Sequence, residues 1–208
     1  MEASNDIIGV VLAGGRSSRM GGGDKCLQML GDSPLLAHVI ARLKPQVSDI
    51  VISANGDPAR FAPFGLPVVA DTLAEFAGPL AGVEAALAWV AANRPGVSWA
   101  VTVPGDTPFF PGDLVARLVD ARGGAGTMVV ARSETGVHPV AGLWPVGMAS
   151  DLKVALAGGF RKVSLWAELQ GAAEAFFAPV EMDGGQVDPF FNINRPEDLA
   201  AAEALLRG

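Results

Sequence analysis

The chain contains few of the residues that build disulfides and metal clusters. Its 208 residues include one cysteine, Cys26, and two histidines. A single cysteine cannot form an internal disulfide or supply a cysteine cluster for a metal, which agrees with a reducing compartment. The neighbouring Lys25 would favour a lowered thiol pKa, but a small, buried, apolar side chain is the expected state of Cys26.

The chain also lacks a membrane-spanning stretch and a net positive charge. Its longest uncharged stretch, residues 135–150, is interrupted by Pro139, Pro145 and three glycines, so it cannot form a spanning helix. The N-terminal MEASND is acidic and has no signal-peptide pattern, so we expect a cytoplasmic protein. The net charge of −7 has the wrong sign for tracking nucleic acid or an anionic membrane, and neither partner is expected.

Short apolar runs alternate with segments of helical spacing along the whole chain. Half of the residues are apolar, which is enough for a sizeable core, and we expect one domain over residues 1–208. The expected strands are 7–12, 49–54, 68–70, 99–103, 128–131, 140–144 and 175–180; the expected helices are 35–43, 80–92, 114–119, 149–156, 163–169 and 196–206. This alternation predicts an α/β fold of three layers, a Rossmann-like, doubly wound and mostly parallel sheet.

A glycine-rich, basic segment follows the first expected strand. Residues 12–25 read LAGGRSSRMGGGDK and contain five glycines, two arginines and one lysine. Glycines let backbone N–H groups approach a ligand, and the basic side chains add positive charge, so the segment suits a polyphosphate. It has neither the G-x-x-x-x-G-K-[ST] nor the G-x-G-x-x-G spacing, which excludes a Walker loop and a dinucleotide fingerprint. A simple turn with a solvated charged face is the alternative.

Polar side chains follow the later strands of the predicted sheet. Ser53 and Asn55 end the second strand, Asp71 follows the third, and Asp106 follows the fourth. Ligands of such folds bind beyond the carboxyl ends of the strands. Carboxylate oxygens suit magnesium, so Asp106 is a candidate metal ligand, whereas a turn aspartate before Pro108 is the alternative.

Five motifs together resemble the molybdenum cofactor guanylyltransferase family. They are LAGGRSSRMGGGDK at 12–25, Asp71, GPLAG at 78–82, PGDTPF at 104–109, and FNIN at 191–194 followed by PEDL at 196–199. They extend from the first strand to the last helix, so the resemblance covers nearly the whole chain. Each motif alone is modest, but the combination is specific.

The resemblance implies a nucleotidyltransferase domain that moves GMP from GTP to the terminal phosphate of molybdenum-molybdopterin. Pyrophosphate leaves, and molybdenum molybdopterin guanine dinucleotide forms with magnesium as the cofactor. Such transfers depend on positioning and charge neutralisation, and no nucleophilic side chain is required. The attacking phosphate is already ionised near neutral pH, which agrees with the scarcity of histidine. The family also implies a molybdenum insertion protein and molybdoenzyme chaperones as partners.

The resemblance assigns roles residue by residue. The expected GTP-binding residues are Leu12, Ala13, Gly14, Gly15, Lys25, Ser53, Asn55, Asp71, Gly78, Pro79, Leu80 and Asp106. Arg19 and Lys25 would neutralise the triphosphate and the leaving pyrophosphate, and with Asp106, the magnesium ligand, they form the expected catalytic set. Asn192 and Asn194 would bind molybdopterin, as alternate residues of one strand that project to the same side.

Three positions depart from the family pattern, and one of them is Gly105, where the family often has cysteine or another small residue. The family commonly has asparagine where Ser53 stands and arginine where Ser18 stands. Serine has a shorter reach, so Asn55 is the alternative nucleotide contact. His138 has two interpretations, a locally satisfied turn residue or a cleft residue, and the Arg161–Lys162 pair is either an exposed charged pair or a phosphate contact.

Three rival functions remain open. A cytidylyltransferase acting on the same cofactor typically reads Leu-Ala-Ala-Gly at the loop and lacks the GPLAG element, which favours guanine for this chain. A sugar-nucleotide or isoprenoid-pathway nucleotidyltransferase shares the loop chemistry but would not end with the segment Asn192–Asn194. A nucleotide-binding or cofactor-carrier protein would use Asp106 only as a cap, and it would not release pyrophosphate.

Overall fold

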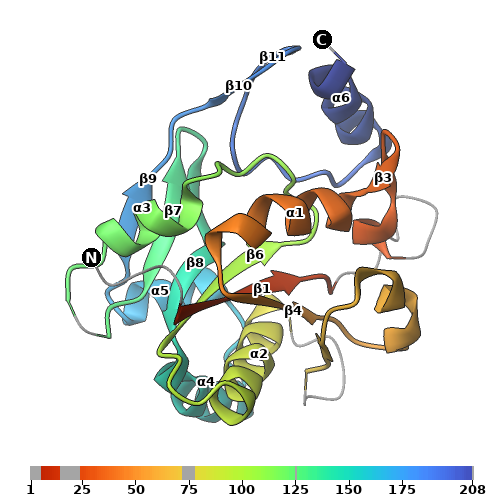
Figure 1. Ribbon diagram of the computed structural model, residues 1–208. Coiled ribbons are helices and arrows are strands. Elements are labelled where there is room, and N and C mark those ends of the chain that lie inside the picture. The colour runs from red at the N-terminus through yellow and green to blue at the C-terminus, as the bar shows by residue number, and fades with distance from the viewer. Residues whose placement is uncertain (1–5, 15–23, 72–77, 125, 208) are drawn as a thin grey trace.

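A seven-stranded sheet forms the centre of the molecule. The computed structural model describes residues 6–14, 24–71, 78–124 and 126–207 (Figure 1). The sheet has the order β5-β4-β1-β6-β8-β7-β9. Its strands are β1 (Ile7–Leu12), β4 (Asp49–Ser53), β5 (Val68–Val69), β6 (Trp99–Pro104), β7 (Val129–Ser133), β8 (Gly136–Pro145) and β9 (Ala173–Phe176). Strand β8 runs antiparallel to β6 and β7, while the other neighbouring pairs are parallel. The prediction of an α/β fold with a mostly parallel sheet is therefore confirmed.

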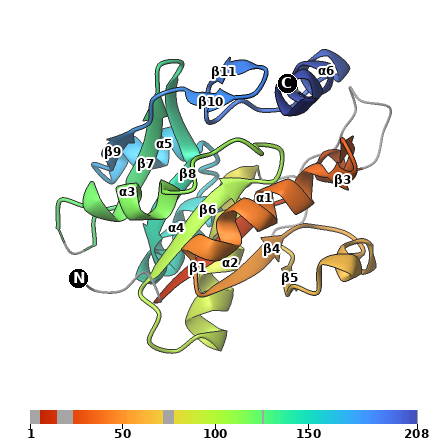
Figure 2. The same ribbon diagram turned by 45° about the horizontal axis from the view of Figure 1, so that its top comes forward.

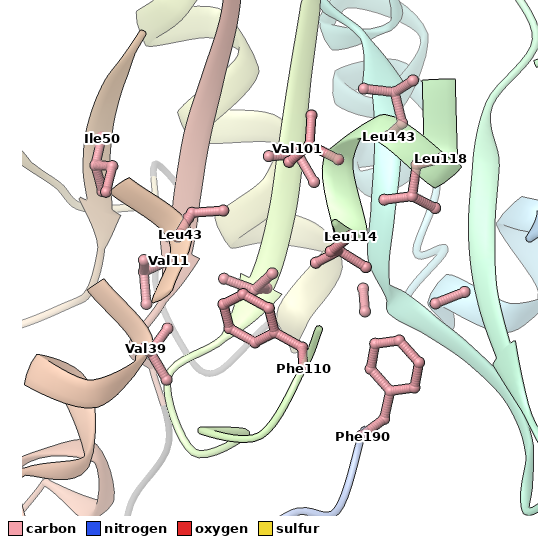
Figure 3. Packing of buried hydrophobic residues seen from close by; sticks show 14 of the residues in the cluster. Val11, Val39, Leu43, Ile50, Val101, Phe110, Leu114, Leu118, Leu143 and Phe190 are labelled. Atoms are coloured by element: carbon pink, nitrogen blue, oxygen red, sulfur yellow. The ribbon is translucent and has the colours of Figure 1, made fainter. Parts of the chain in front are cut away.

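Helices cover both faces of this sheet and complete the three layers. Helices α1 (Leu35–Leu43) and α3 (Leu114–Asp120) share one apolar cluster with the sheet, and α2 (Pro79–Asn93), α4 (Ala149–Ala157) and α5 (Val163–Leu169) share the other. Successive strand residues point to opposite faces, so Val11 joins the first cluster and Val10 the second. Figure 3 shows the first cluster, in which Leu114 lies between Val101 on one side and Phe110 and Phe190 on the other.

A third, smaller cluster joins the last helix to the rest of the molecule. Helix α6 (Pro196–Arg207) lies near two short hairpins, β2 (Met29–Leu30) with β3 (Ser33–Pro34), and β10 (Val180–Met182) with β11 (Gly185–Val187) (Figure 2). Leu30, Val187 and Ala202 are buried together in this cluster. Single-turn or short 3₁₀ helices occupy Lys25–Leu27, Lys44–Gln46, Pro58–Phe64 and Val146–Met148. The cluster holds the C-terminal part of the chain against the carboxyl end of the sheet.

Two of the differences from the expected elements involve a proline. Strand β8 begins at Gly136, earlier than expected, and the β7–β8 register shifts between Val130 and Ala131. The shift leaves Pro139, which has no N–H to donate, outside the β7 ladder. The expected strand 175–180 is wrong in its bounds, because β9 ends at Phe176 and Pro179 separates it from β10.

Candidate active site

The carboxyl ends of β1 and β6 lie side by side and place residues 12–14, the start of the glycine-rich segment, next to the end of β6. The two strands pair in parallel, with Leu12 opposite Pro104. The Gly105 N–H donates to the Leu12 carbonyl oxygen at 3.0 Å, and the Ala13 N–H donates to the Ser53 carbonyl oxygen at 2.9 Å. These bonds continue the sheet past its last paired residues and fix the start of the loop.

Gly105 is needed for this close approach. A Cβ atom added there would lie 3.2 Å from Cys26 Cβ, 3.3 Å from the Leu12 oxygen and 3.4 Å from Ala13 Cα. Cys26 itself is buried, with its Sγ 3.7 Å from the Ala13 carbonyl oxygen, and burial raises the pKa of its thiol to about 12, with a further contribution from the negative charges of Asp24 and Asp106. The buried, apolar interpretation of Cys26 is thus supported, and a lowered thiol pKa is contradicted.

Lys25 connects three segments that are far apart in the sequence. Its Nζ donates both to Asp106 Oδ2 and to Asn194 Oδ1. The side chains of Lys25 and Asp106 keep 15% and 21% of their exposure, so the pair is accessible from solvent. The Ile193 N–H donates to the Asp106 carbonyl oxygen at 3.0 Å and ties the C-terminal segment to the end of β6. Predicted nucleotide, metal and acceptor residues therefore meet at one ammonium group.

The two asparagines lie in this site but not in the way the sequence suggested. Asn192 Oδ1 accepts from Thr107 Oγ1, and Asn194 Nδ2 donates to the Asn192 carbonyl oxygen at 3.3 Å. The described residues 191–194 have no strand conformation, so the expectation that they are alternate residues of one strand is wrong. The segment is instead an irregular connection, because its Ile193 N–H bonds to Asp106 rather than to a neighbouring strand.

Ser53, the last residue of β4, and Asn55, two residues later, have different surroundings. Ser53 is 4% exposed, and its Oγ donates to the Gly82 carbonyl oxygen at 3.2 Å. Asn55 is exposed, and its Oδ1 accepts from the Asp71 N–H at 2.9 Å. The serine hydroxyl is thus bound to helix α2, whereas the asparagine amide stands with Asp71 at the rim of the site.

The GPLAG segment begins helix α2 against the same rim. Gly78 precedes the helix with φ of 78°, a left-handed value that favours glycine, and Pro79 occupies the first turn, where a missing N–H costs nothing. Leu80 is fully buried. A Cβ atom at Gly82 would lie 2.7 Å from Ser53 Oγ and 3.3 Å from Leu12 Cδ2. This glycine therefore allows α2 to approach the ends of β1 and β4.

Arg60 was not among the predicted site residues. It lies in the 3₁₀ helix Pro58–Phe64, pairs with Asp24, and donates to the Asn55 carbonyl oxygen. It therefore joins the end of the glycine loop to the rim at Asn55. The one available signal was a basic residue shortly after the second strand, and no motif distinguished it.

Other predicted residues fall into two groups. Gly15 and Arg19, together with Ser18, lie outside the described residues. Arg161 Nη1 donates to the carbonyl oxygens of Leu156 and Phe160, both at 2.7 Å, so it terminates helix α4, and Lys162 is exposed next to it. These contacts agree with an exposed charged pair.

For a divalent cation, the described part of the site provides the carboxylate of Asp106 rather than a complete set of protein ligands. Within the part of the chain that the structure describes, no group of three or more histidine, cysteine or acidic side chains could hold a metal ion. Magnesium is commonly bound by one or two carboxylates together with substrate phosphates. Asp106 is a single, partly exposed carboxylate, which agrees with that mode of binding.

The sequence is similar to a protein-family model and to known relatives over most of its length. The family model described as the MobA-like NTP transferase domain matches residues 9–173. The chain is 50% identical over 199 residues to a molybdenum cofactor guanylyltransferase of Nitrobacter hamburgensis, covering 95% of this chain and 93% of the relative. It is 52% identical over 198 residues to one of Rhodopseudomonas palustris, with coverages of 94% and 90%.

Solved structures share the fold at lower identity. Molybdopterin-guanine dinucleotide biosynthesis protein A from Archaeoglobus fulgidus has a TM-score of 0.68 at 22% identity, covering 94% of this chain and 96% of its own. A 4-diphosphocytidyl-2C-methyl-D-erythritol synthase from Anaerococcus prevotii has the same TM-score at 12% identity, with coverages of 97% and 96%. A Mycobacterium tuberculosis protein described as a manganese complex has a TM-score of 0.63 at 19% identity, with coverages of 95% and 98%. No helix in the described residues of our chain is long and apolar enough to cross a membrane.

Proposed function

The chain belongs to the MobA-like NTP transferase family, and on this premise we propose that it transfers GMP from GTP to the terminal phosphate of molybdenum-molybdopterin. It is a nucleotidyltransferase, and its relatives at about 50% sequence identity are molybdenum cofactor guanylyltransferases. The observation that carries the proposal is the contact of Lys25 with both Asp106 and Asn194. This contact brings the expected nucleotide side and the expected acceptor side together at the end of β6.

The transfer is a displacement at the α-phosphorus of GTP. An oxygen of the acceptor phosphate forms the new P–O bond, and the bond to the β-phosphate breaks, so that pyrophosphate carries away the electron pair. Lys25 would neutralise the phosphate charge, with Arg19 as its expected partner, and Asn192 and Asn194 would orient the acceptor by their amides. Asp106 would hold a divalent cation, magnesium in our proposal, which supplies charge neutralisation for the phosphates when it is bound.

The fold by itself does not select the nucleotide. The guanine-dinucleotide and diphosphocytidyl proteins match this chain with equal TM-scores, so the shared architecture serves more than one nucleotide. Guanine is supported by the identity of about 50% to guanylyltransferases and by the GPLAG segment at the start of α2. A cytoplasmic location and transfer of the product to an insertion protein or chaperone stay predictions.

Pyrophosphate release tests the proposed function directly. The purified chain is incubated with magnesium, molybdenum-loaded molybdopterin and either GTP, CTP or ATP, and control reactions omit the acceptor or contain excess chelator. We expect release with GTP and acceptor together and at least tenfold less with the other nucleotides. Preference for CTP would reassign the chain to cytidylyl transfer. Absence of release with every nucleotide, from folded protein, would favour a binding or carrier protein.

Asn55 and Ser53 provide a paired test of nucleotide contact. Asn55→Ala should raise the GTP dissociation constant about tenfold, because it removes an exposed amide and leaves the Asp71 N–H without its acceptor. Ser53→Ala should change that constant by less than about twofold, because the hydroxyl is bound to Gly82 inside the protein. Calorimetric titration with GTP and magnesium measures both constants. A larger effect at Ser53 than at Asn55 would reverse the assignment.

A further inference from the structure

A polar cluster at the tip of the β7–β8 hairpin surrounds the carboxylate of Asp188. Ser133 ends β7 and is 3% exposed, Thr135 lies in the turn, and His138 lies in β8. Ser133 Oγ and Thr135 Oγ1 donate to Asp188 Oδ2 at 2.6 and 2.9 Å, and the Phe190 N–H donates to Asp188 Oδ1 at 2.8 Å. Both carboxylate oxygens therefore accept hydrogen bonds, and the hydroxyl donors come from the hairpin.

The surroundings of Asp188 favour the ionised form of its carboxylate. Burial alone would raise the pKa of Asp188, but the hydrogen bonds from Ser133, Phe190 and Thr135 outweigh it and hold the pKa below its ordinary value. Burial lowers the pKa of His138, so its ring is neutral near pH 7. Ser133 has one proton, which it donates to Asp188, so His138 Nε2, 2.7 Å from Ser133 Oγ, carries the hydrogen that Ser133 accepts.

The cluster lies directly before the segment that carries the acceptor asparagines. The Phe190 ring packs on His138 with 4.6 Å between ring centroids and on Phe177 with 5.4 Å. Three residues later, the Ile193 N–H bonds to the Asp106 carbonyl oxygen. At the far end, Asp198 Oδ2 accepts from the Asn194 N–H at 2.8 Å. The irregular segment 188–194 is therefore held by a carboxylate at each end, and one of them reaches the β7–β8 hairpin.

We propose that Asp188 is a positioning residue for the acceptor half of the site: it anchors segment 188–194 to the β7–β8 hairpin and so sets where Asn192 and Asn194 present their amides. The inference rests on the proposed function. Without the anchor, the segment keeps the Asp198 contacts but loses three hydrogen bonds at its start. The acceptor subsite loosens, whereas the GTP contacts at Asn55, Asp71 and the start of α2 come from other elements and remain.

Two substitutions at Asp188 and matched ones at Asp183 test the proposal. Asp183 is exposed in the β10–β11 turn and belongs to the same C-terminal region, so Asp183→Ala and Asp183→Asn make the same chemical changes away from the anchor. We expect Asp188→Ala to raise the KM for molybdenum-molybdopterin about tenfold and to leave the KM for GTP within about twofold. Asp188→Asn should have a smaller effect, because its amide oxygen still accepts. The Asp183 variants should match the wild type.

Amide hydrogen exchange at Ile193 provides a readout that needs no activity. In Asp188→Ala, the Ile193 N–H should exchange at least tenfold faster than in the wild type, without substrate and at unchanged protection of β1 and β6. Unchanged exchange, or equal rises of both KM values, would overturn the positioning role. If the wild type releases no pyrophosphate but the Ile193 exchange rises as expected, the proposed function fails while the anchoring by Asp188 stands.

Discussion

Replacing Asp106 by asparagine should reduce kcat for pyrophosphate release about a thousandfold, since charge stabilisation at the phosphates is the main contribution to this kind of transfer. The substitution preserves the size of the side chain but removes its negative charge. The asparagine side chain cannot form the ion pair with Lys25, and it offers no carboxylate to the divalent cation. This one change therefore removes both the ion pair to Lys25 and the expected metal contact.

The folded structure should tolerate this substitution. Asp106 keeps 21% of its side-chain exposure, and its backbone carbonyl, which accepts from the Ile193 N–H, is unchanged. Initial rates at saturating GTP and acceptor measure the effect, with thermal unfolding recorded on the same samples. Asp113→Asn, at an exposed position before α3 where the side chain makes no capping hydrogen bond, is the matched control and should retain full activity. A fall of less than tenfold in Asp106→Asn would remove this residue from the catalytic set.

Gly142→Ala should have a large effect on stability, a loss of about 3 kcal/mol in the free energy of unfolding. Gly142 lies in β8, which pairs with both β6 and β7. A Cβ atom there would lie 2.6 Å from the Val129 carbonyl oxygen, and this contact is with backbone of the neighbouring strand. The strands must separate locally to accommodate it, because no flexible side chain is available to move away.

Thermal unfolding measures this loss as a decrease of roughly 6–12 °C in Tm for a chain of this size. Gly147→Ala is the control, because a Cβ atom at Gly147 would meet nothing within 4 Å and the residue has no left-handed φ. Its free energy of unfolding should change by less than about 0.5 kcal/mol. Equal Tm values for Gly142→Ala and the wild type would show that β7 and β8 can separate without cost.

Much of this protein follows from local sequence patterns. The bounds of β1, α1 and α5 are those expected from apolar spacing, because these elements have one or two buried faces and clear ends. The location of the candidate site beyond the strand ends also follows from the sequence, since the parallel neighbours β1 and β6 bring residues 12–14 and 104–106 to one edge of the sheet. Family motifs added the assignment of nucleotide, metal and acceptor residues.

Other features depend on contacts between distant segments and could not be read locally. Ser53 and Asn55 are two residues apart on one strand end, yet only the packing of α2 shows that the Ser53 hydroxyl is used inside the protein. Asp188 carries no motif of its own, and its role arises because the β7–β8 hairpin brings two hydroxyl groups to it.

The sequence by itself determined the alternation of elements, the strand ends at which ligands are expected to bind, and the family, because these follow from periodicity and from motifs in the sequence. Only the tertiary structure decided which side chains meet. The joining of Lys25, Asp106 and Asn194 depends on how segments 81 and 169 residues apart along the chain pack together. Such contacts are fixed by the packing of the whole molecule, and no local pattern encodes them.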